Sequence, residues 1–217
     1  MPHLKQKRNE NYTELLFIMM FDYFRSARKK QRASHLRYFL MHMMYKYGFK
    51  FSTYLDVGAC NSIELDQYCD LFDNVVAFEP NPKAIIIPRD NLILHQKALS
   101  DREEVRDFHI DMTIPHYSTL NRQKMDKYIP EGHDWKIMQV TTAKLDDYEL
   151  RPSCIKIDTE GEDDAVVRGA YSTITKWKPI LYLEFMSQET EQSLIDIGYT
   201  VEYSSWIDNF LIHEDYI

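Results

Sequence analysis

Two acidic residues end successive apolar segments in the first half of the chain. YLDVGACNS, residues 54–62, carries Asp56 and Gly58 just before an expected helix, and VVAFEPNP, residues 75–82, carries Glu79, 23 positions after Asp56. A glycine at such a turn lets backbone N–H groups approach a ligand closely. A carboxylate after the second strand can accept hydrogen bonds from both hydroxyls of a ribose. The spacing therefore predicts a nucleoside-binding site.

The glycine content of the first turn indicates which nucleoside ligand fits. Cys60 and Ser62 occupy the positions where a dinucleotide fingerprint has glycine. A pyrophosphate needs three glycines for its cradle, and an acid at the position of Glu79 selects against a 2′-phosphate. An adenosine without a pyrophosphate is therefore favoured over NAD.

A second group of carboxylates lies in the other half of the chain. Asp158 and Glu160 belong to CIKIDTEGEDDAVVRGA, residues 154–170, and Glu184 ends ILYLEF, residues 180–185. The carboxyl ends of parallel strands share one edge of a sheet, so we expect these three side chains to converge. They could bind a divalent cation such as Mg²⁺ or Mn²⁺, or hold a substrate hydroxyl and take its proton. For Glu160 the alternative is an electrostatic role at a helix N-terminus.

The elements that must position these groups follow the pattern of an α/β protein. Short apolar runs alternate with helical stretches from Thr53 onward, which predicts a Rossmann-like, mostly parallel sheet. The expected strands are 53–57, 74–79, 92–98, 154–158 and 179–185, and the expected helices are 62–72, 81–88, 161–176 and 188–197. Residues 199–204 and 209–213 indicate a terminal antiparallel hairpin.

Residues 101–150 interrupt this alternation. Two expected strands, 104–110 and 137–144, flank the polar stretch 111–135, which contains Pro115 and Pro130. A long loop inside a compact domain is usually functional or mobile. We therefore expect 101–150 to be an insertion whose central part, 111–135, acts as a lid that selects the substrate.

The first 50 residues differ in charge from the remainder. They hold 11 Lys and Arg against 3 Asp and Glu, a net +8, whereas residues 51–217 hold 15 against 31, a net −16. Apolar spacing over 11–32 and 36–47, with Gly48 as a stop, predicts two helices. A basic helical layer beside an acidic domain is favoured over a segment that docks on a partner, a membrane surface or a polyanion. We expect a helical appendage over 1–50 and one domain over 51–217.

The amino-acid composition indicates the cellular compartment of the protein. The chain has 217 residues, 44% of them apolar, and no window approaches the run of about 18 apolar residues that a membrane span needs. The N-terminal sequence lacks the apolar run of a secretory signal. Cys60, Cys69 and Cys154 show neither CxxC spacing nor an even number, so a disulfide framework or zinc cluster is not indicated. We expect a cytoplasmic protein without a transmembrane segment.

Seven short motifs occur in order along residues 53–185. They are DVGA at 56–59, FEPNP at 78–82, KALSD at 97–101, LDDY at 145–148, IKIDTEGED at 155–163, RGA at 168–170 and LYLEF at 181–185. This combination resembles the FkbM family of methyltransferases. The resemblance implies a class I S-adenosyl-L-methionine fold and O-methylation of a sugar, a glycan or another small hydroxylated metabolite.

The resemblance also implies roles for individual residues. The cofactor would be held by Asp56, Gly58, Ala59, Glu79, Asn81, Ala98 and Ser100. Asp158, Glu160 and Glu184 would line the reaction site and would be the ligands of any divalent cation. The family usually continues DVGA with Asn-Ile-Gly, whereas this chain has Cys60, Asn61 and Ser62, so the turn is expected to sit differently on the methionine portion.

Two other functions remain open at this stage. The first is RNA 2′-O-methylation, since Asp158, Lys178 and Glu184 loosely resemble the groups that such enzymes place around a ribose hydroxyl. The net −16 of residues 51–217 disfavours a nucleic acid partner. The second is a scaffold that binds the cofactor without turnover, against which the retained carboxylates argue. A base from the expected lid region is also conceivable, the candidates being His109, His116 and His133, although packed or solvated histidines are commoner.

Overall fold

The computed structural model describes residues 36, 39–41, 43, 47–204 and 208–217. The chain divides into two units, Met1–Lys50 and Phe51–Ile217. In the first unit, residues 36, 39–41, 43 and 47 are helical, and Gly48 ends the helix in the left-handed region at φ +68°. This confirms the second predicted helix within the described residues, whereas the helix predicted over 11–32 lies outside them.

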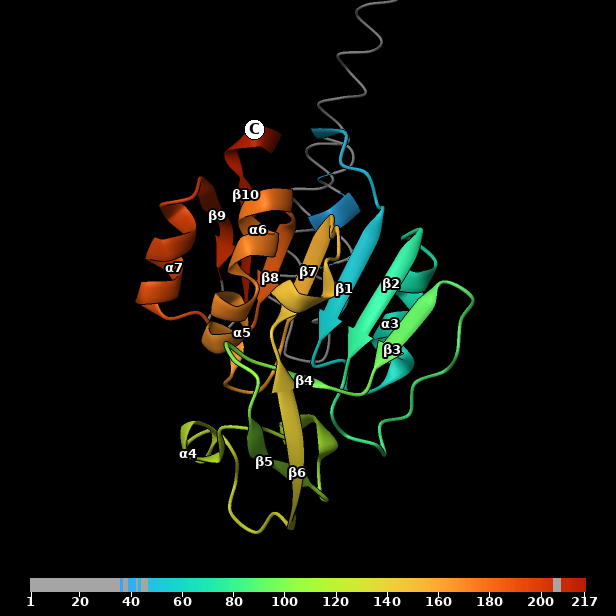
Figure 1. The fold of residues 1–217 in the computed structure, drawn as a ribbon, viewed down its shortest axis with the longest axis vertical. Coiled ribbons are helices and arrows are strands. Elements are labelled where there is room, and N and C mark those ends of the chain that lie inside the picture. The colour runs from blue at the N-terminus through green and yellow to red at the C-terminus, as the bar shows by residue number, and fades with distance from the viewer. Residues whose placement is uncertain (1–35, 37–38, 42, 44–46, 205–207) are drawn as a thin grey trace, which may run out of the picture. The chain divides into compact units, whose positions relative to one another are not determined.

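A seven-stranded sheet forms the centre of the second unit (Figure 1). From one edge to the other its strands are β3 (Leu92–His95), β2 (Asn74–Phe78), β1 (Thr53–Val57), β7 (Cys154–Ile157), β8 (Ile180–Leu183), β10 (Asn209–His213) and β9 (Tyr199–Ser204). The first five are parallel, and β10 runs antiparallel to both β8 and β9. The predicted Rossmann-like sheet with a terminal antiparallel hairpin is confirmed.

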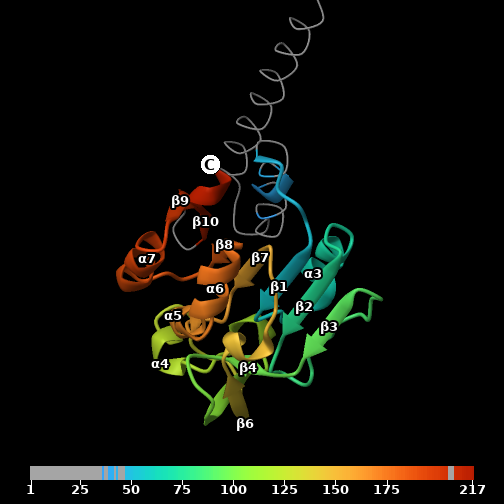
Figure 2. The ribbon, with the colours of Figure 1, turned by 45° about the horizontal axis from the view of Figure 1, so that its top comes forward.

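Helices cover both faces of this sheet. In Figure 1, α5 (Asp163–Gly169) and α6 (Tyr171–Trp177) lie in front of it and α3 (Ser62–Cys69) lies behind β2, and Figure 2 shows the same layers from another side. The sequences CIKI of β7 and ILYL of β8 are buried at every position, as expected for central parallel strands. The last helix, α7 (Gln188–Ile195), precedes the hairpin, and Gly198 follows it at φ +93°.

The helix predicted over 81–88 is wrong, because the chain makes a single turn there and then runs without regular structure. Asn81 starts the turn: its side chain accepts from Lys83 N at 3.0 Å and its carbonyl from Ala84 N at 3.0 Å. The β-branched run that follows exposes 75% of Ile85 and 51% of Ile87. A helix here would have had poor propensity and no buried face to stabilise it.

Two further boundaries differ from the predicted ones. The helix expected over 161–176 is two helices, α5 and α6, which meet at Ala170. The strand expected over 92–98 is also two, because Lys97 N donates to His95 O at 2.8 Å and turns the chain between β3 and β4 (Ala98–Leu99). The chain therefore leaves the large sheet at this point.

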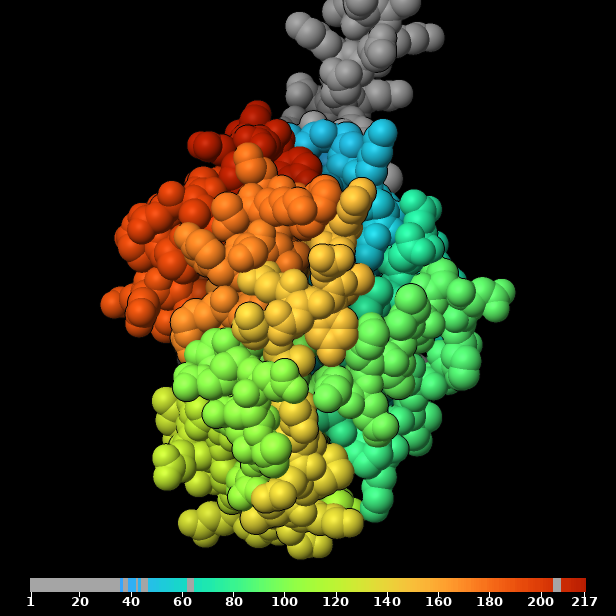
Figure 3. Space-filling model, viewed as in Figure 1, coloured from blue at the N-terminus to red at the C-terminus, as the bar shows by residue number. Residues whose placement is uncertain are grey.

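Strand β4 belongs to a second, three-stranded sheet with the order β4-β6-β5. Strands β5 (Val105–Asp111) and β6 (Trp135–Ala143) pair antiparallel from Val105↔Thr141 to Asp111↔Trp135. They confirm the two strands predicted around the polar segment 111–135. In Figure 3 this sheet and that segment form the lower part of the second unit.

The segment 111–135 is ordered by local bonds around Asp111. The fully buried Asp111 carboxylate accepts from Thr113 N at 2.8 Å and Ile114 N at 2.9 Å, and it pairs with His133. The segment also contains two short helices, η2 (Pro115–Tyr117) and α4 (Arg122–Met125). Its two ends are thus joined by the contact between Asp111 and His133 and by the bond from Met112 N to Asp134 O at 2.8 Å.

Several motifs of the sequence are explained by packing between elements. The carbonyl of Ser100 lies against Gly169, where a Cβ would come within 2.0 Å of it, and Arg168 donates to Asp101 at 3.0 Å. The LDDY motif forms η3 (Leu145–Tyr148), in which Asp146 accepts from Thr173 N at 2.8 Å and so caps α6.

Within the described part of the chain, no helix has the length and apolarity to cross a membrane.

The contact at Gly169 makes a testable prediction about stability. An alanine in an open helical position stabilises relative to glycine by about 0.5–1 kcal/mol. Gly169→Ala is expected to do the opposite and to lower the free energy of unfolding by about 1–3 kcal/mol, because backbone and not a flexible side chain must move. Urea denaturation measures the change, with the exposed Ser172→Ala as a control within about 0.5 kcal/mol. A stabilised Gly169→Ala protein would contradict the described packing.

Candidate functional site

A cavity opens at the carboxyl ends of β1, β2 and β7. The turns after these three strands supply part of its wall, and β4, β5 and the segment 111–135 supply the remainder. The lining residues are Val57, Gly58, Cys60, Phe78, Glu79, Pro80, Asn81, Lys97, Ala98, Leu99, Phe108, Pro115, His116, Ser118, Leu120, Asp158, Thr159, Glu160 and Glu162. This is the edge at which open parallel sheets bind ligands.

The turn after β1 depends on glycine for a reason that the sequence did not reveal. Gly58 takes φ +87°, and a Cβ on it would lie 1.9 Å from the carbonyl oxygen of Asp158. Gly58 N also donates to Phe78 O at 2.9 Å. The glycine therefore lets the turns after β1 and β7 touch, in addition to any approach to a ligand.

Glu79 is a buried acidic residue that lines the cavity. The residue is 6% exposed, and its carboxylate accepts from Cys60 N at 2.8 Å and Asn81 N at 2.7 Å. Burial raises the pKa of Glu79, and these two backbone bonds oppose that rise. Each carboxylate oxygen keeps a second lone pair for a ligand hydroxyl. Asn81 contributes its backbone N–H to this arrangement.

An apolar wall of the cavity comes from Phe78, Ala98, Leu99 and Phe108. Ala98, one of the residues predicted to hold the cofactor, therefore lines the cavity. Ser100 lies outside the cavity lining, and its hydroxyl donates to Glu162 Oε1 at 2.8 Å, within a group completed by the Arg106–Glu162 ion pair. Asp56 and Ala59 also lie outside the lining, in the strand and turn that support it.

The three carboxylates predicted to converge do so. Asp158, Glu160 and Glu184 each place an oxygen within 4.8 Å of the others. The strand ends bring them together, since Asp158 N donates to Val57 O and Glu184 N donates to Ile157 O, both at 3.0 Å. Asp158 and Glu160 also line the cavity that contains Glu79.

Asp163 is a residue of this region to which the sequence reasoning gave no role. It is fully buried, and its carboxylate accepts from Thr159 Oγ1 at 2.9 Å, Gly161 N at 3.3 Å and Phe185 N at 3.2 Å. Burial, reinforced by the charge of Asp158, raises its pKa to about 6. Asp163 therefore links the turn that carries Asp158 and Glu160 to Phe185, the residue directly after Glu184.

Lys156 is the second residue without a predicted role. Its ammonium lies 3.2 Å from Asp56 Oδ1 and 3.3 Å from Asp158 Oδ2, and the residue is 5% exposed. Burial raises the pKa of Asp56, and Lys156 opposes that rise. A lysine inside a strand that is otherwise apolar was the available signal, because a buried charge requires a partner.

The residues named for the alternative functions lie in different places. Lys178 caps the end of α6 and pairs with Asp215 at 2.6 Å. His133 is engaged by Asp111, and His109 belongs to β5. Of the three candidate histidines, only His116 lines the cavity.

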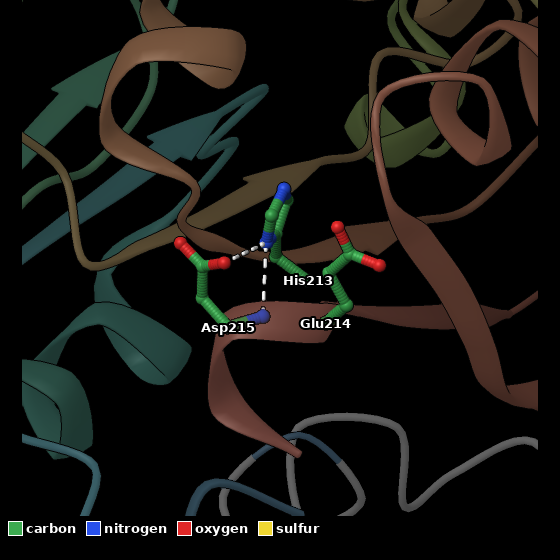
Figure 4. A group of neighbouring side chains, drawn as sticks. All are labelled: His213, Glu214 and Asp215. Atoms are coloured by element: carbon green, nitrogen blue, oxygen red, sulfur yellow. Dashed lines mark hydrogen bonds and ion pairs between the residues drawn. The ribbon is translucent and has the colours of Figure 1, made fainter.

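A second group of possible metal ligands, His213, Glu214 and Asp215, is explained by local structure (Figure 4). His213 Nε2 donates to Ile197 O at 2.9 Å, and Nδ1 accepts from Asp215 N at 3.1 Å. Nδ1 also lies 3.5 Å from Asp215 Oδ1, so both ring nitrogens have partners within the chain. The group caps the chain after β10.

The seven-stranded sheet and the cavity at its edge define a Rossmann-like α/β domain with a candidate ligand site at the carboxyl edge of the sheet. The family model for the methyltransferase FkbM domain matches residues 56–216, and the chain belongs to this family. The ordered motifs of the sequence predicted this family, and the family model confirms it.

The crystal structure of methyltransferase FkbM from Methylobacillus flagellatus KT matches with a TM-score of 0.48 and 13% sequence identity. The match covers 90% of this chain and 58% of that one, so the chain spans somewhat over half of that protein's length. No curated protein matches the sequence.

The surroundings of Cys60 predict low reactivity. Burial, together with the negative charges of Glu79 and Asp158, raises the pKa of the Cys60 thiol to about 12. At pH 8 the thiolate is scarce, and iodoacetamide is expected to label Cys60 at least about 100-fold more slowly than in urea-unfolded protein. Peptide mass spectrometry resolves this site. Similar rates in folded and unfolded protein would contradict the described environment.

Proposed function

We propose that the protein transfers a methyl group from S-adenosyl-L-methionine to a hydroxyl of a small molecule or glycan, with a sugar as the favoured acceptor. One observation carries the proposal: Asp158 and Glu160 line the same cavity as Glu79 and the apolar wall. The proposed nucleoside site and two of the three carboxylates would therefore share one cavity. The preference for a sugar rests on the family resemblance.

The residues of the cavity fit the proposed cofactor. A buried carboxylate with its lone pairs directed by two backbone N–H groups suits a ribose diol, which Glu79 would hold. The apolar wall of Phe78, Ala98 and Leu99 suits an adenine ring. Gly58 and Cys60 would bound the methionine portion. S-adenosyl-L-methionine, when bound, would supply an electrophilic methyl group on its sulfonium.

The carboxylate group supplies the other half of the chemistry. Asp158, Glu160 and Glu184 would orient the acceptor hydroxyl, and one of them would take its proton as the oxygen gains the methyl carbon. The carbon–sulfur bond breaks in the same step, so charge and atoms balance. A Mg²⁺ or Mn²⁺ ion on the same three oxygens is the alternative arrangement, and it would make turnover sensitive to a chelator.

The net charge of residues 51–217 and the free cysteines support the proposed class of acceptor and the proposed cellular compartment. The net −16 of residues 51–217 opposes a nucleic acid acceptor. Cys60, Cys69 and Cys154 are all free thiols, which supports the reducing environment of the cytoplasm.

Replacing Glu79 tests the cofactor half of the proposal. Glu79→Gln removes the negative charge facing the ribose, and the dissociation constant for S-adenosyl-L-methionine is expected to rise about 10- to 100-fold. Calorimetric titration measures it, with NAD as the competing ligand and the exposed Glu131→Gln protein as the control. An unchanged affinity in a folded Glu79→Gln protein, or tighter binding of NAD, would refute the assignment.

Replacing the converging carboxylates tests the catalytic half. Asp158→Asn and Glu184→Gln are each expected to lower kcat about 100-fold or more, with the dissociation constant of the cofactor within about threefold. Transfer of a labelled methyl group to a panel of sugars measures kcat, and the exposed Asp73→Asn protein is the control. Loss of turnover on adding EDTA would favour the metal arrangement. Full activity of both variants would exclude these carboxylates from catalysis.

A further inference from the structure

Lys156 occupies the centre of a polar row across the large sheet. The register pairs Asp56 of β1 with Lys156 of β7, and Lys156 with Tyr182 of β8. Residues in register on adjacent strands project to the same face. The ammonium accordingly reaches Asp56 Oδ1 at 3.2 Å.

The same ammonium also reaches along its own strand. Asp158 follows Lys156 by two residues, and residues two apart in an extended chain lie on one face. The distance from Lys156 Nζ to Asp158 Oδ2 is 3.3 Å. The side chains of Lys156 and Asp56 are 6% and 2% exposed, whereas that of Asp158 is 23% exposed. One buried cation therefore holds a buried carboxylate and a carboxylate that faces the cavity.

We infer that Lys156 is a positioning residue for methyl transfer, which holds the Asp158 carboxylate beside Glu160 and Glu184 and ties it to the strand that carries the cofactor turn. The catalytic importance of the Asp158 position rests on the proposed function. The ion pairs themselves come from the geometry of β1 and β7.

A lysine suits this task for chemical reasons. Its ammonium has three donors on one nitrogen, so it can bond to two carboxylates that approach from a neighbouring strand and from its own. The neighbouring Tyr182 is occupied elsewhere, since its hydroxyl donates to Asp208 Oδ1 at 2.8 Å. The competing explanation is that Lys156 only neutralises Asp56 and that Asp158 would keep its place without it.

A pair of variants separates these two explanations. Lys156→Met alone leaves Asp56 buried without its counter-ion, so it is expected to unfold more readily and is not decisive. Asp56→Asn combined with Lys156→Met removes both charges and avoids an unpaired buried ion. Asp56→Asn alone is the reference protein, because it keeps the lysine and its contact with Asp158.

Two measurements on the double variant decide the matter. Its crystal structure is expected to show the Asp158 carboxylate turned away from Glu160 and Glu184, whereas Asp56→Asn keeps the three together. Its kcat for methyl transfer is expected to be about 100-fold below that of Asp56→Asn, with the KM for the cofactor within about threefold.

An Asp158 carboxylate that stays in place in the double variant would overturn the inference, and so would a kcat equal to that of Asp56→Asn. The crystal structure requires no turnover. If the wild-type protein transferred no methyl group, the proposed function would fail, while the position of Asp158 would still decide the role of Lys156.

Discussion

The close contact between Gly58 and the carbonyl of Asp158 is the constraint on which the rest of the site depends. Parallel pairing of β1 with β7 brings the turns after these strands together, and only a residue without a Cβ fits between them. The first turn carries the backbone that meets Glu79, and the second carries Asp158 and Glu160. The turn that meets Glu79 and the turn that carries Asp158 and Glu160 thus become neighbours through one backbone contact.

Buried charged residues stabilise the two turns and hold them in place. Lys156 joins Asp56 to Asp158, and Asp163 joins the second turn to Phe185, directly after Glu184. Each of these groups is expensive to bury alone, so each requires its partners at bonding distance. The family motifs accordingly contain two kinds of residue: those that line the cavity and those that fix the turns. Gly169 belongs to the second kind, since it admits the carbonyl of Ser100.

The order of apolar runs was enough to predict the sheet and the convergence of Asp158, Glu160 and Glu184, because strand ends at one edge must meet. Periodicity failed at residues 81–88, where one turn is followed by exposed isoleucines, and it missed the break between β3 and β4. Ser100 shows a different limit of the sequence. It was predicted to hold the cofactor, but its hydroxyl donates to Glu162 and the residue lies outside the cavity lining. Contacts between residues distant in sequence, such as Lys156 with Asp56, have no periodic signature.

In the proposed function, Glu79 binds the ribose of an adenosine cofactor at the edge where the carboxylates converge. A crystal structure with S-adenosylhomocysteine, the demethylated product, is the most direct test. Both ribose hydroxyls are expected within hydrogen-bond distance of the Glu79 carboxylate, with adenine against Ala98 and Leu99 and the sulfur facing Asp158, Glu160 and Glu184. A nucleoside bound elsewhere, or one whose ribose turns away from Glu79, would contradict it.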